Sequence, residues 1–397
     1  MKITDISVIN LSFPVDPPMA DAIHLIPARN LVLVQVHTDA GITGMGEAAS
    51  YGGPMESTAT VIMKELRPRL IGEDPFKVEY LWRKMAIPSH QHGRGGILFA
   101  AISGIDIALY DIIGQATKMP LYKLLGGYRD EVQAYASAGF YRGGKTAEDL
   151  AEECARYAEE GFTHVKIKVG RNKEVILNPL HNMAEPDYAS VTMEEDLERV
   201  RLVRKAIGPK IRLSVDANNA WTPSIAIQMG KEMEKYNIAW LEEPVYTDDI
   251  EGSAHVAHVL DVPIAGYETC VTLAQFRELI VRRAVDIVQP DVIWSGGITE
   301  TRKIAALAHA YQLPVIPHVF SSGLSLVANL HFIASIPNGG LLEFDRNKND
   351  LRTMLFNEEI EIDKRGYVKV PDRSGLGVTL NQATIDKYRI EVPIPAD

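Results

Sequence analysis

The sequence has few cysteines, no long apolar run and no excess of positive charge, and each absence excludes a class of protein. Its two cysteines, Cys154 and Cys270, are too few for a disulfide framework and too far apart for a C-x-x-C motif, which favours the cytoplasm. No apolar run reaches the roughly 18 residues of a membrane span, and Asp5 and Asn10 interrupt the first apolar segment, so we expect neither a span nor a signal peptide. Lys and Arg total 41 against 52 Asp and Glu, and the formal net charge of -11 argues against nucleic-acid or anionic-lipid partners.

The composition is that of an ordinary folded protein. Of the 397 residues, 46% are hydrophobic and 23% are charged, which is enough apolar material for a large core. This length predicts two domains, or one large barrel with an appendage.

The first third of the chain has the pattern of an α+β domain. Residues 3–13, 31–38 and 42–47 read as strands of an antiparallel meander, and helices are expected over 55–70, 77–85 and 96–116. The segment 15–29 holds three prolines, which exclude a helix, and we expect it to form a flap.

From about residue 132 the pattern alternates short apolar strands with helices. Capping boxes begin two of these helices, Thr146 with Asp149 and Thr192 with Glu195, and a polar insertion at 171–190 interrupts the alternation. The expected strands are 132–139, 164–169, 211–217, 238–243, 263–268, 287–291, 315–319 and 341–344. Eight such units predict a (β/α)8 barrel over a doubly wound sheet, because no Gly-rich phosphate loop follows the first strand. We therefore expect a capping domain at 1–130, a barrel at 131–354 and a segment at 355–397 that packs on the cap.

Ionisable residues stand at the ends of seven successive expected strands. Three of them, Asp216, Glu242 and Glu268, are acids on adjacent strands that would repel one another when buried unless a cation lies between them. Oxygen ligands without His or Cys favour Mg2+. The alternative is that these acids are solvated at the mouths of loops.

The other strand-end residues have the character of acid–base groups. Lys166 and Lys168 are two apart on one strand and therefore face the same side, where each lowers the pKa of the other and makes a general base. Asp291 and His318 end adjacent strands, so the acid can orient the imidazole opposite Lys168. The alternative for His318 is a purely structural histidine.

With these residues in this order, the chain resembles the mandelate racemase subgroup of the enolase superfamily over its whole length. The resemblance implies the following roles: Asp216, Glu242 and Glu268 bind Mg2+, Lys168 and His318 are the acid/base pair, Asp291 orients His318, Lys166 holds the substrate carboxylate, Glu343 supports the enediolate, and Asn218 with the cap residues Tyr51 and His24 contacts substrate. Asp291 stands where muconate-cycloisomerase-like relatives carry a lysine, which argues against that chemistry. Tyr267 directly before Glu268 departs from the family pattern.

The reaction implied by this resemblance is removal of the proton α to a carboxylate through an enediolate. We expect dehydration of an acid sugar to a 2-keto-3-deoxy acid, with racemisation or epimerisation of a 2-hydroxy acid as the alternative. A catalytically idle sugar-acid binding protein would need a broken ligand or base position, and none is visible. The expected partners are a small carboxylate substrate and further copies of the chain, in the cytoplasm, with no nucleic acid and no membrane.

Overall fold

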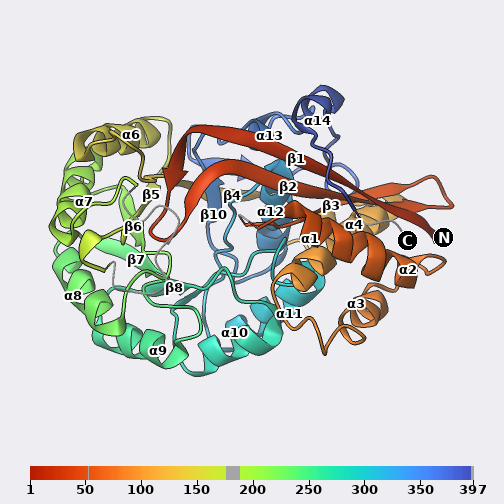
Figure 1. The fold of residues 1–397 in the computed structure, drawn as a ribbon, viewed down its shortest axis with the longest axis horizontal. Helices are drawn as coiled ribbons and strands as arrows, with labels where there is room; N and C mark the ends of the chain where they lie inside the picture. The colour runs from red at the N-terminus through yellow and green to blue at the C-terminus, as the bar shows by residue number, and fades with distance from the viewer. Residues whose placement is uncertain (52, 176–187, 395–397) are drawn as a thin grey trace.

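The chain folds into an antiparallel sheet with its helices and a curled, mostly parallel sheet surrounded by helices (Figure 1). The structure is a computed structural model that describes residues 1–51, 53–175 and 188–394. Most of the polar insertion expected at 171–190 lies outside the described residues.

The first sheet is formed by β1 (Ile3–Ala20), β2 (Leu25–Thr38) and β3 (Thr43–Ala48), in that order and antiparallel. The segment 15–29, expected to be a flap, is the far part of the β1–β2 hairpin, whose strands pair as far as Ala20 and Leu25 with a register shift between Pro14 and Met19. The prolines Pro17 and Pro18 fit there because β1 is an edge strand, where a missing N–H leaves no partner unpaired.

The helices of this part follow the expected ranges. They are α1 (Met55–Thr60), a π-helical turn η1 (Val61–Leu66), α2 (Arg67–Leu70), α3 (Val78–Ala86), α4 (Ile97–Thr117) and α5 (Leu121–Leu124). The long helix α4 lies against β3, and a Cβ on Gly46 would come within 2.0 Å of the carbonyl oxygen of Gly104. Although α4 is long and apolar enough to cross a membrane, 83% of its most apolar window is buried inside the protein.

The second sheet carries the parallel strands of the barrel region. They are β4 (Glu131–Ser137), β5 (His164–Lys168), β6 (Arg212–Asp216), β7 (Ile238–Glu242), β8 (Ile264–Gly266), β9 (Ile287–Val288) and β10 (Leu342–Asp345). Their order is β10-β4-β5-β6-β7-β8-β9. The expected strand at 315–319 is not a regular strand: Val315 alone forms bridges, to Val288 and Gly339.

Helices connect these strands and form the outer layer seen in Figure 1. They are a 3-10 turn η2 (Lys173–Val175), α6 (Ala147–Glu159), α7 (Met193–Ile207), α8 (Pro223–Glu234), α9 (Ile250–Val259), α10 (Thr272–Val281), α11 (Gly297–Ala310) and α12 (Gly323–Ser335). Both predicted capping boxes are confirmed, at Thr146 for α6 and at Thr192 for α7.

The last part of the chain contacts both sheets. It contains α13 (Asp350–Thr353), β11 (Tyr367–Lys369) and α14 (Gln382–Tyr388). Strand β11 pairs antiparallel with β4, whereas the N–H of Ile390 donates to the carbonyl oxygen of Asn10 in β1 at 2.9 Å. This segment therefore ties the barrel sheet to the first sheet.

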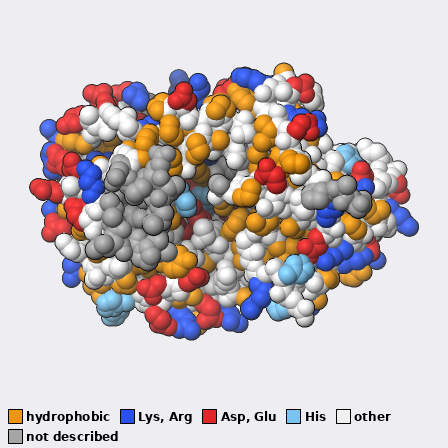
Figure 2. All heavy atoms as spheres, viewed as in Figure 1, with side chains coloured by type: hydrophobic (Ala, Val, Ile, Leu, Met, Phe, Trp, Pro, Cys, Tyr) orange, Lys and Arg blue, Asp and Glu red, His pale blue; other side chains and the backbone are white. Residues whose placement is uncertain are grey.

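The end of the β1–β2 hairpin lies over the barrel sheet. Ala20 bridges to Tyr141, which follows β4, and Arg29 in β2 pairs with Asp345 of β10 at 3.0 Å. The carboxyl ends of the parallel strands therefore lie beneath the cap, and the face seen in Figure 2 is hollowed near its centre, with acidic and histidine side chains visible inside.

Candidate active site

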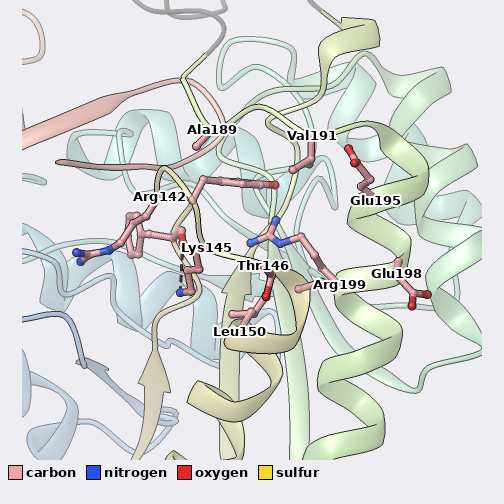
Figure 3. Close-up of a pocket in the computed structure, with 12 residues that line it drawn as sticks. Arg142, Lys145, Thr146, Leu150, Ala189, Val191, Glu195, Glu198 and Arg199 are labelled. Atoms are coloured by element: carbon pink, nitrogen blue, oxygen red, sulfur yellow. Dashed lines mark hydrogen bonds between the residues drawn. The ribbon is translucent and has the colours of Figure 1, made fainter. Parts of the chain in front are cut away.

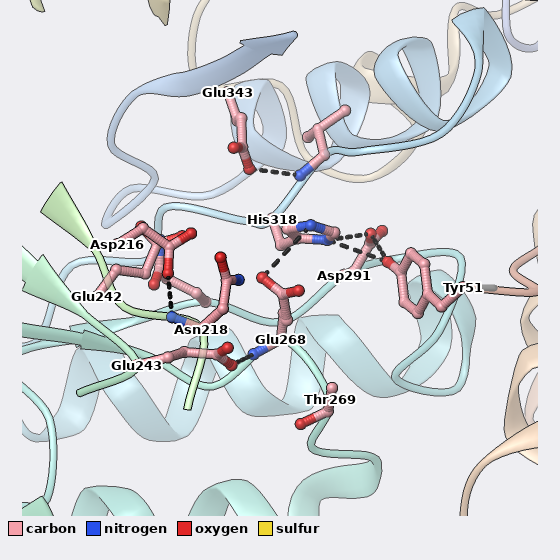
Figure 4. A network of polar contacts seen from close by, with 12 residues as sticks. Tyr51, Asp216, Asn218, Glu242, Glu243, Glu268, Thr269, Asp291, His318 and Glu343 are labelled. Carbon is pink, nitrogen blue, oxygen red and sulfur yellow. Dashed lines mark hydrogen bonds and ion pairs between the residues drawn. The ribbon is translucent and has the colours of Figure 1, made fainter. Parts of the chain in front are cut away.

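Three strand-end residues are aligned side by side by the strand register. Lys168 of β5 pairs with Asp216 of β6, and Asp216 pairs with Glu242 of β7. Glu268 follows β8 by two residues, and its backbone N–H donates to the Oε1 atom of Glu243 at 2.9 Å. The predicted acids are thus brought to one end of the sheet and are buried or nearly so (Figure 4).

The two lysines of β5 are buried among these acids. Lys166 Nζ pairs with Glu242 Oε1 and lies 2.9 Å from Glu343 Oε1 and 3.7 Å from Asp216 Oδ2, while Lys168 Nζ contacts Asp216 Oδ2. Glu343 also accepts a 2.8 Å bond from the N–H of Val319. Each lysine is therefore held by carboxylates of other strands of the same sheet.

The electrostatics of Lys168 differ from the sequence expectation. Burial lowers its pKa and so does the charge of Lys166, as expected, but Asp216, Glu268 and Glu242 together outweigh both and raise the pKa of Lys168 above its usual value. The sequence places Lys166 beside Lys168, but it does not show the contact between Lys168 and Asp216.

His318 lies between two carboxylates. Its Nδ1 atom is 2.9 Å from Asp291 Oδ2, and its Nε2 atom is 3.4 Å from Glu268 Oε2. Burial lowers the pKa of His318, but Glu268, Asp291 and Glu343 outweigh burial and raise it to about 9. The imidazole is therefore favoured in its protonated form, with one nitrogen fixed by Asp291 and the other directed at the acid cluster.

Asp291 is held at both carboxylate oxygens. Its Oδ1 atom accepts from Asn329 Nδ2 at 3.0 Å and from the N–H of Ile293 at 3.1 Å, while Oδ2 faces His318. Such a saturated carboxylate has little freedom to turn, so it fixes the orientation of the imidazole.

The chain turns sharply after β6. Asn218 and Asn219 both have positive φ, 40° and 65°, a conformation that Asn tolerates better than most residues. The turn lets the N–H of Asn218 donate to Asp216 Oδ1 at 2.9 Å, and Asn218 Oδ1 is buried with no hydrogen-bond partner among the described residues.

The acids influence each other's ionisation. Burial, together with Asp216 and Glu343, outweighs Lys166 and raises the pKa of Glu242 to about 7. Burial also raises the pKa of Glu343, but Lys166, His318 and Lys168 reverse this and lower it to about 2. The pKa of Glu268 is raised, chiefly by burial.

The residues present fit a hard divalent cation by the chemistry of their donors. In this arrangement no three His, Cys, Asp or Glu side chains of the described ranges converge on one point as a metal site, since Lys166 and Lys168 contact the acids instead. The set Asp216, Glu242 and Glu268 nevertheless offers only oxygen atoms, beside the unpartnered buried oxygen of Asn218. Carboxylate and carbonyl oxygens are the ligands that Mg2+ favours.

The two expected cap residues lie at the same end of the sheet. His24 has 61% of its side chain exposed, and its Nδ1 atom is 3.1 Å from Asp21 Oδ2, which is the main cause of its raised pKa. The charge of Glu268 raises that pKa further, and the charge of Lys168 lowers it. Tyr51 reaches further in and contacts Asp291 and His318 (Figure 4).

Sequence reasoning missed three buried acids around the site. Glu243 binds Asn219 Nδ2 at 2.7 Å as well as the N–H of Glu268, so it supports the backbone of a predicted metal ligand. Glu47 accepts from the hydroxyls of Ser321 and Ser322, in the segment after His318. The third, Asp21, holds His24. Only Glu243 left a sequence signal, as the second acid of the Glu-Glu-Pro run.

A separate cavity of about 290 Å³ lies beside the strand-end cluster, between the segment after β4 and helix α7 (Figure 3). Two of its basic side chains are paired with acids of the protein, Lys145 with Glu153 and Arg199 with Asp196. Phe140, which lines it, also lies under Lys168 Nζ at 5.0 Å from the ring centre. Since these charges are internally balanced, we assign no ligand to this cavity.

Comparison with known families agrees with this geometry. Residues 3–126 match the model of the mandelate racemase / muconate lactonizing enzyme N-terminal domain, and residues 149–384 match the enolase C-terminal domain-like model. The chain belongs to the enolase superfamily, within its mandelate racemase subgroup.

Individual relatives cover nearly the whole chain. It is 42% identical to the arabinonate dehydratase of Saccharolobus solfataricus over 90% of both chains, and 34% identical to the D-galactarolactone cycloisomerase of Agrobacterium fabrum over 99% of this chain and 100% of that one. Among solved structures, a racemase from Streptomyces coelicolor A3(2) with bound magnesium superposes with a TM-score of 0.86 at 30% identity, over 98% of this chain and 100% of that one.

Proposed function

We propose that this protein dehydrates an acid sugar to a 2-keto-3-deoxy acid, using Mg2+. The observation that carries the proposal is that Lys168 contacts Asp216 while His318 Nε2 lies 3.4 Å from Glu268, so that both candidate acid–base groups adjoin the same set of acids. The similarity to the arabinonate dehydratase supports the same reaction class.

The proposal includes the architecture. We infer that the curled sheet closes as a (β/α)8 barrel, with the segment at Val315 completing the ring between β9 and β10. We also propose a capping domain at 1–130, a barrel at 131–354 and a C-terminal segment at 355–397, in a homo-oligomer of the cytoplasm.

Asp216, Glu242 and Glu268 would hold the Mg2+ ion, since they are the oxygen donors at three successive strand ends. When bound, the ion would offset their mutual repulsion and stabilise the negative charge that the substrate carboxylate gains as its α-proton leaves. Asn218 offers its unpartnered Oδ1 atom to a substrate hydroxyl.

Lys168 removes the α-proton of a substrate that presents this proton to it. The C–H electron pair passes into the enediolate, and the proton moves to Lys168 Nζ, which must be neutral beforehand. Lys166 favours that neutral state because its charge lowers the pKa of Lys168, whereas the Asp216 carboxylate opposes it; Mg2+ held by Asp216 would offset that opposing charge. Lys166 also holds the substrate carboxylate. Glu343 supports the enediolate from strand β10.

His318 then completes the reaction from the opposite side. Its protonated Nε2 donates to the β-hydroxyl, the C–O bond breaks, and water leaves with that proton. The resulting enol becomes the 2-keto acid. Asp291 is suited to orient this imidazole because it is fixed at Oδ1 and faces Nδ1 with Oδ2.

His24 is the cap residue that we propose to contact the substrate. Asp21 favours its protonated form, so the imidazole presents positive charge and a donor to an acidic or hydroxylated chain end. Tyr51, expected to contact the substrate as well, has its hydroxyl already engaged by Asp291.

Racemisation or epimerisation of a 2-hydroxy acid is the second candidate. The opposed pair Lys168 and His318 suits it, since one group could remove the proton and the other return it to the opposite face. Structural similarity to the racemase of Streptomyces coelicolor with bound magnesium favours racemisation or epimerisation as the second candidate.

A substrate screen separates the two. Purified protein with Mg2+ is incubated in D2O with arabinonate, xylonate, galactonate, galactarate and D-galactarolactone, and α-deuterium and 2-keto product are followed by NMR and semicarbazide absorbance. Dehydration yields 2-keto acid from at least one acid sugar. Exchange with inversion but no 2-keto acid identifies a racemase, and neither exchange nor product with any compound contradicts the proposal.

A further inference from the structure

A cap side chain completes the hydrogen bonding of the His318–Asp291 pair. The Tyr51 hydroxyl donates to Asp291 Oδ2 and lies 3.0 Å from His318 Nδ1, which is itself 2.9 Å from the same Oδ2 (Figure 4). The three groups form a closed triangle. A protonated His318 Nδ1 can donate to both partners, while the single Tyr51 proton is directed at the carboxylate.

The carboxylate at the centre of this triangle is fixed from two domains. The barrel holds Asp291 Oδ1 through Asn329 and the N–H of Ile293, whereas the cap reaches Oδ2 through Tyr51. Removing the Tyr51 hydroxyl would therefore free the one oxygen that faces the imidazole.

Packing holds the Tyr51 ring in place. Its centre lies 5.1 Å from the ring centre of Trp294 and 5.5 Å from that of His318, edge-on to the imidazole. The N–H of Ala49 also donates to the carbonyl oxygen of Ile293 at 3.3 Å. The segment after β3 is therefore bound to the loop that carries Asp291.

The same part of the cap also forms hydrogen bonds with the segment after His318. Glu47 of β3 accepts hydrogen bonds from the Ser321 and Ser322 hydroxyls and from the N–H of Ser325, at the start of α12. The cap thus touches the chain on both sides of the pair: near Asp291 through Ala49 and Tyr51, and beyond His318 through Glu47.

We propose that Tyr51 is a positioning residue that sets the orientation of His318, so that the histidine is fully assembled only when the cap is seated on the barrel. This inference rests on the proposed function for its kinetic consequence, since that function makes His318 the proton donor to the leaving hydroxyl. It replaces the expectation that the Tyr51 hydroxyl binds substrate.

The kinetic test compares Tyr51→Phe, which keeps the ring, with Tyr122→Phe, whose hydroxyl contacts Asp130 at 2.7 Å in another part of the protein. For an acid sugar that the wild type dehydrates, we expect Tyr51→Phe to lower kcat by about 10- to 100-fold, the usual effect of removing an outer partner. KM should stay within about twofold, because the substrate loses no contact. The rate of α-deuterium exchange, which needs Lys168, should be unchanged, as should all rates of Tyr122→Phe.

Three kinetic outcomes would overturn the inference. A raised KM with an unchanged kcat in Tyr51→Phe would make Tyr51 a substrate contact, and wild-type values of both would show that its hydroxyl has no role in the reaction. Equal losses of exchange and dehydration would show that the hydroxyl does not act through His318.

A spectroscopic test stands independently of turnover. Protein labelled with 15N-histidine and loaded with Mg2+ is examined by NMR, and the His318 ring signals are assigned by their loss in His318→Asn. We expect the Nδ1 and Nδ1–H signals to move in Tyr51→Phe and in Asp291→Asn, and to keep their positions in Tyr122→Phe. Unchanged His318 signals in Tyr51→Phe would contradict the inference. If no acid sugar is turned over, the proposed function fails, but these spectra still decide the role of Tyr51.

Discussion

Buried acids occur in two regions of this protein, and their partners differ. In the cap, the hydrogen-bond donors that the described residues offer to Asp106 and Asp111 are neutral: Thr299 and the N–H of Ile298 for the first, and the N–H groups of Met45 and Leu376 with the Gln115 amide for the second. At the barrel mouth, Asp216 and Glu242 face lysines and each other, and Glu268 and Asp291 face a histidine.

The difference shows in how the acids ionise. Burial raises the pKa of Asp106 to about 7 and that of Asp111 to about 6, because neutral donors offset only part of the lost hydration. At the strand ends, the acids differ in the direction of the pKa shift: the pKa of Glu242 is raised to about 7, and that of Glu343 is lowered to about 2 by the positive charges beside it. Burial alone therefore raises the pKa of an acid in this protein, whereas charged partners from other strands decide the direction of the shift at the strand ends.

Removal of the metal should have the largest effect on turnover, and it should depend on the acids at the strand ends and not on the buried acids of the cap. Exhaustive treatment with EDTA should abolish turnover, and added Mg2+ should restore it, because no protein cation replaces the ion in stabilising the enediolate. Glu268→Gln should remain inactive at any Mg2+ concentration, while Asp111→Asn should keep the wild-type response. Full turnover after chelation would contradict the metal assignment.

Asp291→Asn should slow dehydration by about two to four decades, the usual contribution of an acid–base group and its partner. The amide cannot supply the negative charge that favours the protonated imidazole of His318. The matched control is Asp106→Asn, which changes an equally buried acid of the cap and should leave kcat near the wild-type value. A wild-type rate in Asp291→Asn would mean that His318 is only structural.

The smallest expected effect is on the free energy of unfolding, whose change with pH tests the direction of the pKa shift of Glu47. Burial raises the pKa of Glu47 to about 7 from an ordinary 4.5, so its stabilising contribution is complete below pH 4.5 and is lost as the pH rises to 7. Over those 2.5 units, the free energy of unfolding of the wild type should fall by about 3 kcal/mol relative to that of Glu47→Gln. Denaturant titrations at several pH values measure this difference. A difference that is constant with pH would show that the Glu47 carboxyl is not perturbed.

Much of the site could be predicted because strand ends recur at regular intervals. A repeated strand–helix unit places Asp216, Glu242 and Glu268 at equivalent positions, and the strand register brings the first two side by side as expected. The capping boxes were equally accessible, since they depend on residues three apart.

The rest depends on contacts that no local pattern contains. The bond from Tyr51 to Asp291 joins residues 240 apart in the sequence, and the carboxylate that raises the pKa of Lys168 comes from another strand. The segment 15–29 was predicted as a flap because its prolines exclude a helix, but an edge strand accepts them equally well. Residues 315–319 have the composition of a strand, yet only Val315 forms bridges.

The most direct test of the account follows α-deuterium exchange and 2-keto acid formation in two variants, Lys168→Met and His318→Asn, with Mg2+ and an acid sugar that the wild type dehydrates. If Lys168 removes the α-proton and His318 assists departure of the hydroxyl, His318→Asn should exchange the α-proton without forming product. Lys168→Met should then do neither. Exchange and product formation in both variants, at rates near those of the wild type, would show that neither residue performs the chemistry and would contradict the mechanism.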